Sequence, residues 1–169
     1  MAETVYILLG SNLGDRERNM EKAVEQLSAI PGLEMVAASS IYLTEAEGMD
    51  DDAPAFLNQV IKADYDYLPN ELLGALELIE KRLGRIGKGL MQPRTIDLDI
   101  LLFGDQIIET EQLSVPHREL LNRAFAMVPL LQIDPDIVHP VTKRPVAEFL
   151  EENEAQSVLM FKDYVARHI

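Results

Sequence analysis

The chain of 169 residues is 47% hydrophobic and carries a formal net charge of −14, from 29 acidic and 15 basic residues. Its length predicts one compact domain, 1–169, with a hydrophobic core, and its acidic surface argues against binding nucleic acid, whose phosphates it would repel. The lack of cysteine excludes disulfides and thiolate metal sites, and because no apolar run has membrane-spanning length and no signal-peptide pattern is present, we expect a cytoplasmic protein.

The first half of the chain alternates between apolar runs and one amphipathic segment. Residues 4–9 predict a buried strand, and residues 33–44 and 56–65 predict two more. After the first strand, a helix is indicated by apolar residues at helical spacing, namely Met20, Ala23, Val24, Leu27 and Ile30. Pro31-Gly32 ends this helix, and the acidic segment 45–54 predicts a loop.

The second half begins with another amphipathic helix. Pro69 opens it, at a position where the missing N–H costs nothing, and Gly84 terminates it. Its apolar stripe consists of Leu72, Leu76, Ile79 and Leu83. The elements expected after it are a strand over 95–103, its hairpin partner over 106–109, and helices over 119–131 and 146–151.

The order of these elements is strand, helix, strand, strand, helix, strand. This order predicts an α+β fold of the ferredoxin-like type. Its antiparallel sheet would have helices packed on one face, and a C-terminal helical extension would follow. The second face of the sheet would then be free to carry chemistry.

The strongest local signal is Pro93-Arg94-Thr95-Ile96-Asp97-Leu98-Asp99. Alternate residues of a strand share a face, so Asp97 and Asp99 point the same way, with Cα atoms about 6.6 Å apart. The opposite face of the strand would carry the apolar residues Ile96, Leu98, Ile100 and Leu102. Two adjacent carboxylates repel each other unless one is protonated or a cation lies between them. Magnesium suits such a pair, because it fills its remaining coordination positions with water and substrate phosphates. A polar outer strand face is the simpler interpretation of this pattern taken alone.

Basic residues gather just before this strand. Arg85 and Arg94 flank a glycine-containing stretch, and Lys88 lies at its centre. Phosphoryl-type transfer needs positive charge around the transferred phosphates and control of water access. A loop bordered by arginines can supply both, although the same residues can also simply solvate a turn and a helix end.

Several single residues are candidates for ligand contacts. His117 precedes a helix that carries Arg123, a placement suited to phosphate or nucleotide binding. Asn58 can hydrogen-bond the edge of a flat heterocycle and Phe125 can stack on one, although structural roles are the more frequent for such residues. The segment Gly10-Ser11-Asn12-Leu13-Gly14 lacks the Gly-Lys-Ser/Thr ending of a phosphate-binding loop, so we interpret it as a tight strand-to-helix turn.

Six short motifs occur in one order along most of the chain, from about Val5 to at least Pro135. They are Gly10-Ser11-Asn12-Leu13-Gly14, Phe56-Leu57-Asn58, Gly84-Arg85, Pro93-Arg94-Thr95-Ile96-Asp97-Leu98-Asp99, Val115-Pro116-His117 and Arg123-Ala124-Phe125. In this order they resemble the 6-hydroxymethyl-7,8-dihydropterin pyrophosphokinase family. The resemblance implies a ferredoxin-like fold and transfer of diphosphate from ATP to the pterin alcohol, with release of AMP, in folate biosynthesis.

The resemblance also implies roles for individual residues. The catalytic residues would be Arg85, Arg94, Asp97 and Asp99, with Asp97 and Asp99 ligating two Mg²⁺ ions. ATP would contact Glu80, Arg85, Lys88, Arg94, Ile100, Ser114, His117, Arg118 and Arg123. The pterin would contact Thr44, Glu45, Glu47, Phe56, Asn58 and Phe125. We expect a monomer that binds ATP and the pterin, but neither nucleic acid nor a membrane.

Two other functions stay open at this stage. A metal-dependent phosphohydrolase or a nucleotide-sugar transferase also uses an Asp-x-Asp pair, but a hydrolase needs a residue that positions water, and none is evident. A ferredoxin-like domain that only binds a small heterocycle has no need of Asp97, Asp99 and Arg94 together. Release of phosphate instead of AMP would favour the first alternative, and a silent Asp97→Ala substitution would favour the second.

Overall fold

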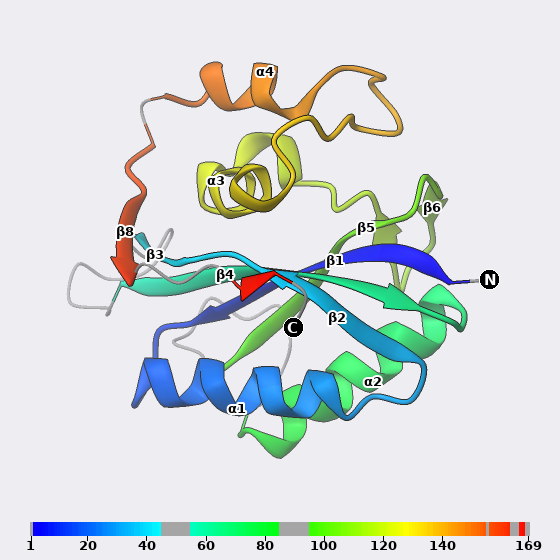
Figure 1. Cartoon of the computed structure of the whole chain (residues 1–169), viewed down its shortest axis with the longest axis vertical. Coiled ribbons are helices and arrows are strands. Elements are labelled where there is room, and N and C mark those ends of the chain that lie inside the picture. The colour runs from blue at the N-terminus through cyan, green and yellow to red at the C-terminus, as the bar shows by residue number, and fades with distance from the viewer. Residues whose placement is uncertain (1, 45–54, 85–94, 155, 163–165, 168–169) are drawn as a thin grey trace.

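An antiparallel sheet forms the centre of the computed structural model, which describes residues 2–44, 55–84, 95–154, 156–162 and 166–167 (Figure 1). In these ranges the main sheet has seven strands, with the order β5-β1-β4-β2-β9, while β3 pairs with β4 and β8. The strands are β1 (Glu3–Ser11), β2 (Leu33–Ala38), β3 (Ile41–Thr44), β4 (Phe56–Tyr65), β5 (Asp97–Phe103), β8 (Leu159–Lys162) and β9 (Ala166–Arg167). A small second sheet pairs β6 (Ile108–Glu109) with β7 (Ser114–Val115).

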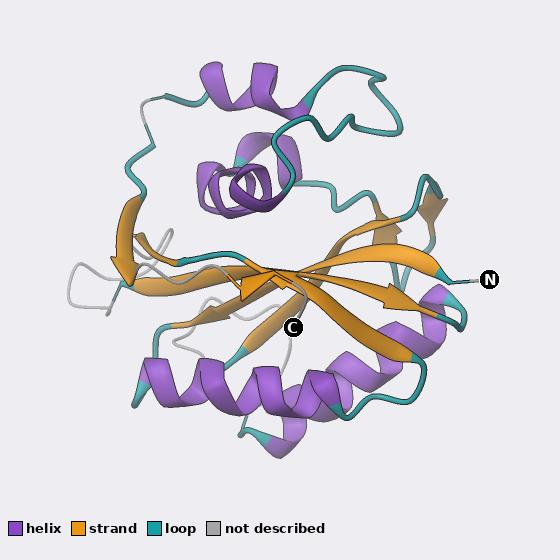
Figure 2. Cartoon of the chain, in the orientation of Figure 1, coloured by secondary structure: helices purple, strands orange, loops and turns teal. Residues whose placement is uncertain are grey.

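Helices lie on both sides of this sheet (Figure 2). The helices α1 (Arg16–Ser28) and α2 (Pro69–Arg82) cover one face. The helices α3 (Ala124–Ile133) and α4 (Val146–Glu151) lie on the other, after the short 3₁₀ helix η1 (Leu120–Asn122). The antiparallel sheet is as predicted, but the expectation that the helices pack mainly on one face was wrong, because α3 and α4 lie on the other. No helix in the described part of the chain is both long and apolar enough to cross a membrane.

The face under α1 and α2, the first face, carries the larger apolar core. Leu57, Ile61 and Tyr65 of β4 point into it, as their alternation predicts. The helix stripes supply its other side, from Met20, Ala23, Leu27, Leu72, Leu76 and Ile79. Gly84 follows α2 with a φ of +97°, a conformation that suits glycine and stops the helix as expected.

The opposite face, the second face, carries its own apolar cluster. Tyr6, Leu8 and Val60 project from β1 and β4 toward α3. The helix covers them with Ala126, Met127, Leu130 and Ile133. The strands are therefore apolar on both sides over part of their length, and water must be excluded from both. This requirement explains why the second face is covered by α3 instead of being free of helices.

A β-bulge in β5 changes which side chains face each layer. The pairing with β1 shifts between Tyr6 and Ile7, so Ile7 lies opposite Ile100 while Tyr6 lies opposite Leu102. One extra residue, Leu101, is accommodated between these pairs. The prediction that Ile96, Leu98, Ile100 and Leu102 share a face is therefore wrong for Leu102, which packs in the second-face cluster.

Three other predicted elements differ in the structure. The strand over 33–44 divides at Ser39-Ser40 into β2 and β3. The residues predicted to pair with β5 instead pair with β7, because a turn with a Thr110 N–H to Leu113 C=O bond of 2.9 Å brings Ile108 opposite Val115. The helix over 119–131 is interrupted by Arg123, whose backbone is extended at φ −124° and ψ 104°. Predictions over 56–65 and 146–151 match β4 and α4 in their bounds.

Candidate active site

The two aspartates lie on the second face, at the start of β5. Asp99 pairs across the sheet with Leu8, and Asp97 pairs with Gly10. Leu8 belongs to the second-face cluster, so both carboxylates point to the side of the sheet that carries α3. Both side chains are half-buried, while Leu98 between them is fully buried on the first face. The alternation that predicted a shared face for Asp97 and Asp99 therefore holds.

Gly10 leaves space between Asp97 and Asn58. Gly10 pairs with Asp97 on one side and with Asn58 on the other, so the three residues form one row across the sheet. A Cβ atom at Gly10 would lie 3.4 Å from Asn58 Oδ1 and 3.6 Å from the Phe56 ring. Glycine inside a strand often marks the close approach of a ligand. The interpretation of Gly10 and Ser11 as part of a turn was wrong, because both belong to β1.

Ser11 of β1 and Asn19 of α1 support the backbone just before β5. Ser11 is fully buried, and its hydroxyl donates to the Thr95 carbonyl oxygen at 2.5 Å. Asn19 of α1 donates to the Ser11 hydroxyl at 3.4 Å and to the Leu13 carbonyl at 2.8 Å. The turn before α1 is thus linked to the backbone just before β5.

The predicted pterin residues of β3 and β4 lie together at the same end of the sheet. Thr44 pairs with Phe56, two residues before Asn58. Asn58 is 2% exposed, and its Nδ2 donates to Thr44 Oγ1 at 2.8 Å. This bond fixes the side-chain amide, with Oδ1 on the side of Gly10. A buried amide in one orientation is suited to recognising the polar edge of a heterocycle.

His117 lies close to both aspartates. Its backbone N–H donates to the Leu101 carbonyl at 2.9 Å, and its Nδ1 accepts the Glu119 N–H at 3.1 Å. Burial, the largest influence, lowers the pKa of His117, while the negative charge of Asp99 raises it and the positive charge of Arg123 lowers it. A neutral imidazole whose Nδ1 accepts a hydrogen bond carries its proton on Nε2 and can donate it to an anionic oxygen.

Arg123 and Phe125 lie side by side at the start of α3. The Arg123 guanidinium carbon is 5.4 Å from the centroid of the Phe125 ring, within the range of a cation–π contact. Phe125 packs at the edge of the second-face cluster. A residue predicted to contact ATP and one predicted to contact the pterin are therefore neighbours in space.

Glu80 has a contact that its sequence position did not predict. It is 2% exposed, and its Oε2 accepts the backbone N–H of Leu98 at 2.9 Å. Leu98 is the residue between the two aspartates, and β5 is an edge strand of the path β5-β1-β4-β2-β9. Glu80 thus supports the edge of the strand that carries Asp97 and Asp99, and its contact with ATP stays a prediction.

The other predicted residues are less closely grouped. Ile100 is buried in the first-face core, so its side chain points away from the aspartates. Ser114 donates from its hydroxyl to the Pro116 carbonyl at 3.5 Å, and Arg118 is exposed beside His117. The predictions for Glu45, Glu47, Arg85, Lys88 and Arg94 fall outside the described residues.

The donor set fits magnesium better than a metal held by protein ligands alone. In the described ranges no group of three or more histidine, cysteine, aspartate or glutamate side chains could hold a metal ion. Asp97 and Asp99 offer hard carboxylate oxygens on one face of one strand. A site with one or two carboxylates is typical of Mg²⁺ that completes its coordination with water and nucleotide phosphates.

Two carboxylates that can share a metal ion, with a histidine and an arginine nearby, are suited to an enzyme that binds nucleotide phosphates. The sequence profile of the 7,8-dihydro-6-hydroxymethylpterin-pyrophosphokinase (HPPK) family matches residues 6–135, and the chain belongs to that family. It is 43% identical over 150 residues to the 2-amino-4-hydroxy-6-hydroxymethyldihydropteridine pyrophosphokinase of Aquifex aeolicus, covering 89% of this chain and 92% of that one. The enzyme with the same name from Pseudomonas aeruginosa is 39% identical over 140 residues, covering 83% of this chain and 86% of that one.

Longer proteins also match. The folic acid synthesis protein fol1 of Schizosaccharomyces pombe is 38% identical over 159 residues, which cover 94% of this chain but 22% of that protein. The crystal structure of wild-type HPPK-DHPS from Plasmodium falciparum with pteroate aligns with a TM-score of 0.70 at 15% identity, covering 90% of this chain and 42% of the other. Likeness at that identity shows a shared fold, and this chain spans less than half of the solved chain.

Proposed function

We propose that the protein transfers the β,γ-diphosphate of ATP to the 6-hydroxymethyl oxygen of 6-hydroxymethyl-7,8-dihydropterin and releases AMP, a step of folate biosynthesis. Family membership over residues 6–135 supports this activity. The observation that carries it is the placement of Asp97 and Asp99 with His117 on the second face. The hydroxymethyl oxygen attacks the β-phosphorus and releases its proton to solvent, while the bond from that phosphorus to the α,β-bridging oxygen breaks and AMP leaves.

Asp97 and Asp99 are the proposed ligands of two Mg²⁺ ions. When bound, such ions neutralise phosphate charge and orient the β-phosphorus toward its acceptor. Glu80 and Ser11 bond the backbone at Leu98 and at Thr95, and so support the part of the chain from which both carboxylates project.

The cationic and polar residues around this pair would contact the nucleotide. His117 Nε2–H and the Arg123 guanidinium would donate hydrogen bonds to phosphate oxygens, which carry more charge as AMP departs. We assign the remaining ATP contacts to Glu80, Arg85, Lys88, Arg94, Ile100, Ser114 and Arg118. The side chain of Ile100 faces the first-face core, so its contact would come from its backbone.

The pterin would lie beside the gap that Gly10 leaves. The amide of Asn58, oriented by Thr44, would hydrogen-bond the pterin edge. Phe56 and Phe125 would stack on its rings. Glu45 and Glu47 complete the proposed pterin contacts.

We also propose a domain organisation, an oligomeric state and a cellular location for the protein. We assign residues 1–169 to a single ferredoxin-like domain in which the C-terminal segment is an extension of the same unit. The return of β8 and β9 to the main sheet supports this assignment. We further propose that the protein works as a monomer in the cytoplasm.

The activity is tested by an assay for AMP with ATP, Mg²⁺ and 6-hydroxymethyl-7,8-dihydropterin, each omitted in turn. AMP is expected only in the complete mixture, and Asp97→Asn should abolish it. Asp105→Asn is the matched control, because Asp105 is exposed just beyond the far end of β5. Phosphate without AMP would instead indicate a hydrolase, and pterin binding without any turnover would indicate a binding domain.

A further inference from the structure

The side chain of Gln156 forms hydrogen bonds with the backbone on both sides of Arg123. Its Oε1 accepts the Ala124 N–H at 2.8 Å, and its Nε2 donates to the Asn122 carbonyl at 2.8 Å. The amide thus pairs with the chain in the way that a neighbouring strand would. Gln156 lies outside residues 6–135, the part of the chain that matches the HPPK family profile.

These hydrogen bonds take the place of a side-chain cap at the start of α3. Helix α3 has Arg123 at its N-cap position and no side-chain hydrogen bond from that residue. The first backbone N–H groups of a helix have no partner within the helix and need one elsewhere. Gln156 supplies the partner for Ala124, and its second bond to Asn122 fixes the extended backbone of Arg123 from the other side.

Gln156 is itself held in place by the segment after α4. Its Nε2 also donates to Asn153 Oδ1 at 2.9 Å. Asn153 Nδ2 donates to the carbonyls of Phe149 at 2.8 Å and Leu121 at 3.0 Å. The segment therefore connects α4 to the chain just before Arg123.

Beyond Gln156 the chain joins the main sheet next to the residues predicted to contact the pterin. Met160 of β8 pairs with Tyr42 of β3, and Tyr42 pairs in turn with Asn58. Figure 1 shows this segment running from α4 to β8 beside β3. The same short stretch thus connects the start of α3, with Arg123, to the strands that carry Thr44 and Asn58.

We propose that Gln156 is a positioning residue that holds Arg123 in the orientation needed to bind the phosphates of ATP. The inference deepens the proposed function and rests on its assignment of Arg123 to the nucleotide. The C-terminal segment then contributes to nucleotide binding without touching the nucleotide. A peptide backbone held at two points keeps its side chain in a narrower range of directions, so less conformational entropy is lost when the nucleotide binds.

The test compares Gln156→Ala, which removes both bonds, with Gln156→Glu, which keeps the acceptor for Ala124 and removes the donor to Asn122. Both should raise the KM for MgATP about tenfold, the order of loss expected when a contacting group is misplaced. The KM for the pterin should change far less.

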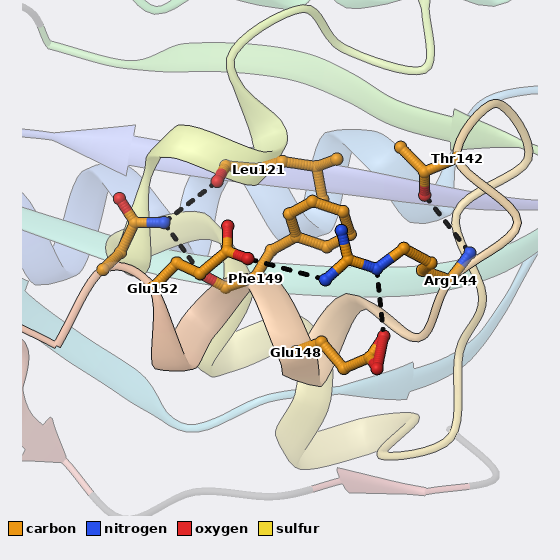
Figure 3. Close-up of polar contacts among 7 residues, drawn as sticks. Leu121, Thr142, Arg144, Glu148, Phe149 and Glu152 are labelled. Atoms are coloured by element: carbon orange, nitrogen blue, oxygen red, sulfur yellow. Dashed lines mark hydrogen bonds and ion pairs between the residues drawn. The ribbon is translucent and has the colours of Figure 1, made fainter.

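Arg144→Ala is the control for loss of structure in the same region. Arg144 pairs with Glu148 at 3.3 Å and Glu152 at 3.5 Å and lies 4.4 Å from the centroid of the Phe149 ring (Figure 3). None of these contacts involves Arg123 or the two residues that flank it, so the loss of Arg144 should lower stability without changing the KM for MgATP. Equal KM values for the Gln156 variants and this control would overturn the proposal.

A double-mutant cycle gives the sharper answer. If Gln156 acts through Arg123, Gln156→Glu should have almost no further effect on the KM for MgATP when Arg123 is already alanine. Additive effects of the two substitutions would overturn the proposal, because they would mean that Gln156 acts on the site independently.

Binding of a non-hydrolysable ATP analogue with Mg²⁺, measured by calorimetry, separates this inference from the proposed function. If the wild-type protein binds the analogue but makes no AMP, the proposed transfer reaction fails, and the cycle is carried out on the Kd instead. Weaker binding in the Gln156 variants, lost in the Arg123→Ala background, would support the positioning role. A wild-type protein that binds no nucleotide would overturn both.

Discussion

The two faces of the sheet use the same strands for different purposes. On the first face, α1 and α2 cover the strands, and side chains such as Leu57, Ile61 and Leu76 are 0% exposed. On the second face, α3 covers Leu8 and Val60, but the row of Asp97, Gly10 and Asn58 lies at the end of the strands. A packed face resists change in volume, whereas a glycine in a polar row lets another group approach the backbone closely.

The comparison predicts that changes on the first face act on stability. Leu76→Ala should lower the free energy of unfolding by about 2–5 kcal/mol, because it removes buried methyl groups and leaves a cavity. Urea denaturation measures this loss. The kcat per folded molecule should be nearly unchanged, and a large fall in kcat would show that the first face also shapes the site.

Changes among the polar residues of the second face should act on turnover. Asp99→Asn keeps the shape of the side chain but removes its charge, and it should lower kcat by about 10²- to 10³-fold, the loss typical of a preorganised electrostatic group. The free energy of unfolding should change much less than in Leu76→Ala. A variant with normal kcat but low stability would break the division between the two faces.

The gap at Gly10 should be sensitive to added volume. Gly10→Val places methyl groups next to Asn58 Oδ1 and the Phe56 ring, and the KM for the pterin should rise by about 10- to 100-fold, as for a pocket that loses the volume of a methylene or two. The KM for MgATP should change less. Gly74→Val is the control, because a Cβ atom at Gly74 meets nothing within 4 Å. Equal KM values for the two variants would show that the pterin does not lie at Gly10.

The smallest effect is a dependence of stability on pH from the loop before α4. His139 is 7% exposed, and its Nδ1 accepts the N–H groups of Val141 at 3.2 Å and Thr142 at 3.3 Å. Burial lowers the pKa of His139 from its ordinary value of 6.5. The unfolded chain therefore takes up a proton at His139 more readily than the folded protein does. The contribution of His139 to stability is fully present above pH 6.5 and is lost as the pH falls below it.

His139→Asn should make the stability curve flatter between pH 7 and 5. Each unit by which folding lowers the pKa of His139 makes the free energy of unfolding about 1.4 kcal/mol smaller at low pH than above pH 6.5. His117 has a lowered pKa as well, so part of the slope should persist in the variant. Thermal unfolding at a series of pH values measures the slope, and identical curves for variant and wild type would contradict the assignment to His139.

Local patterns determined much of this protein. Apolar residues at helical spacing placed α1 and α2, and alternating residues placed β4, since these patterns repeat along the element. Alternation put Asp97 and Asp99 on one face, and the order of short motifs indicated the family that the comparison then matched over residues 6–135. The periodicity and the alternation depend on neighbours within a few positions, and each motif is itself a short local pattern.

Only the tertiary structure decided the rest, because the decisive partners are far apart in the chain. The cover of the second face by α3, the bulge at Leu101 and the bond from Leu98 to Glu80 each depend on pairing between distant segments. Gln156 contacts the backbone beside Arg123 across 32 and 34 positions. A polar side chain shows in the sequence that it needs a hydrogen-bond partner, but only the folded chain shows which backbone group it reaches.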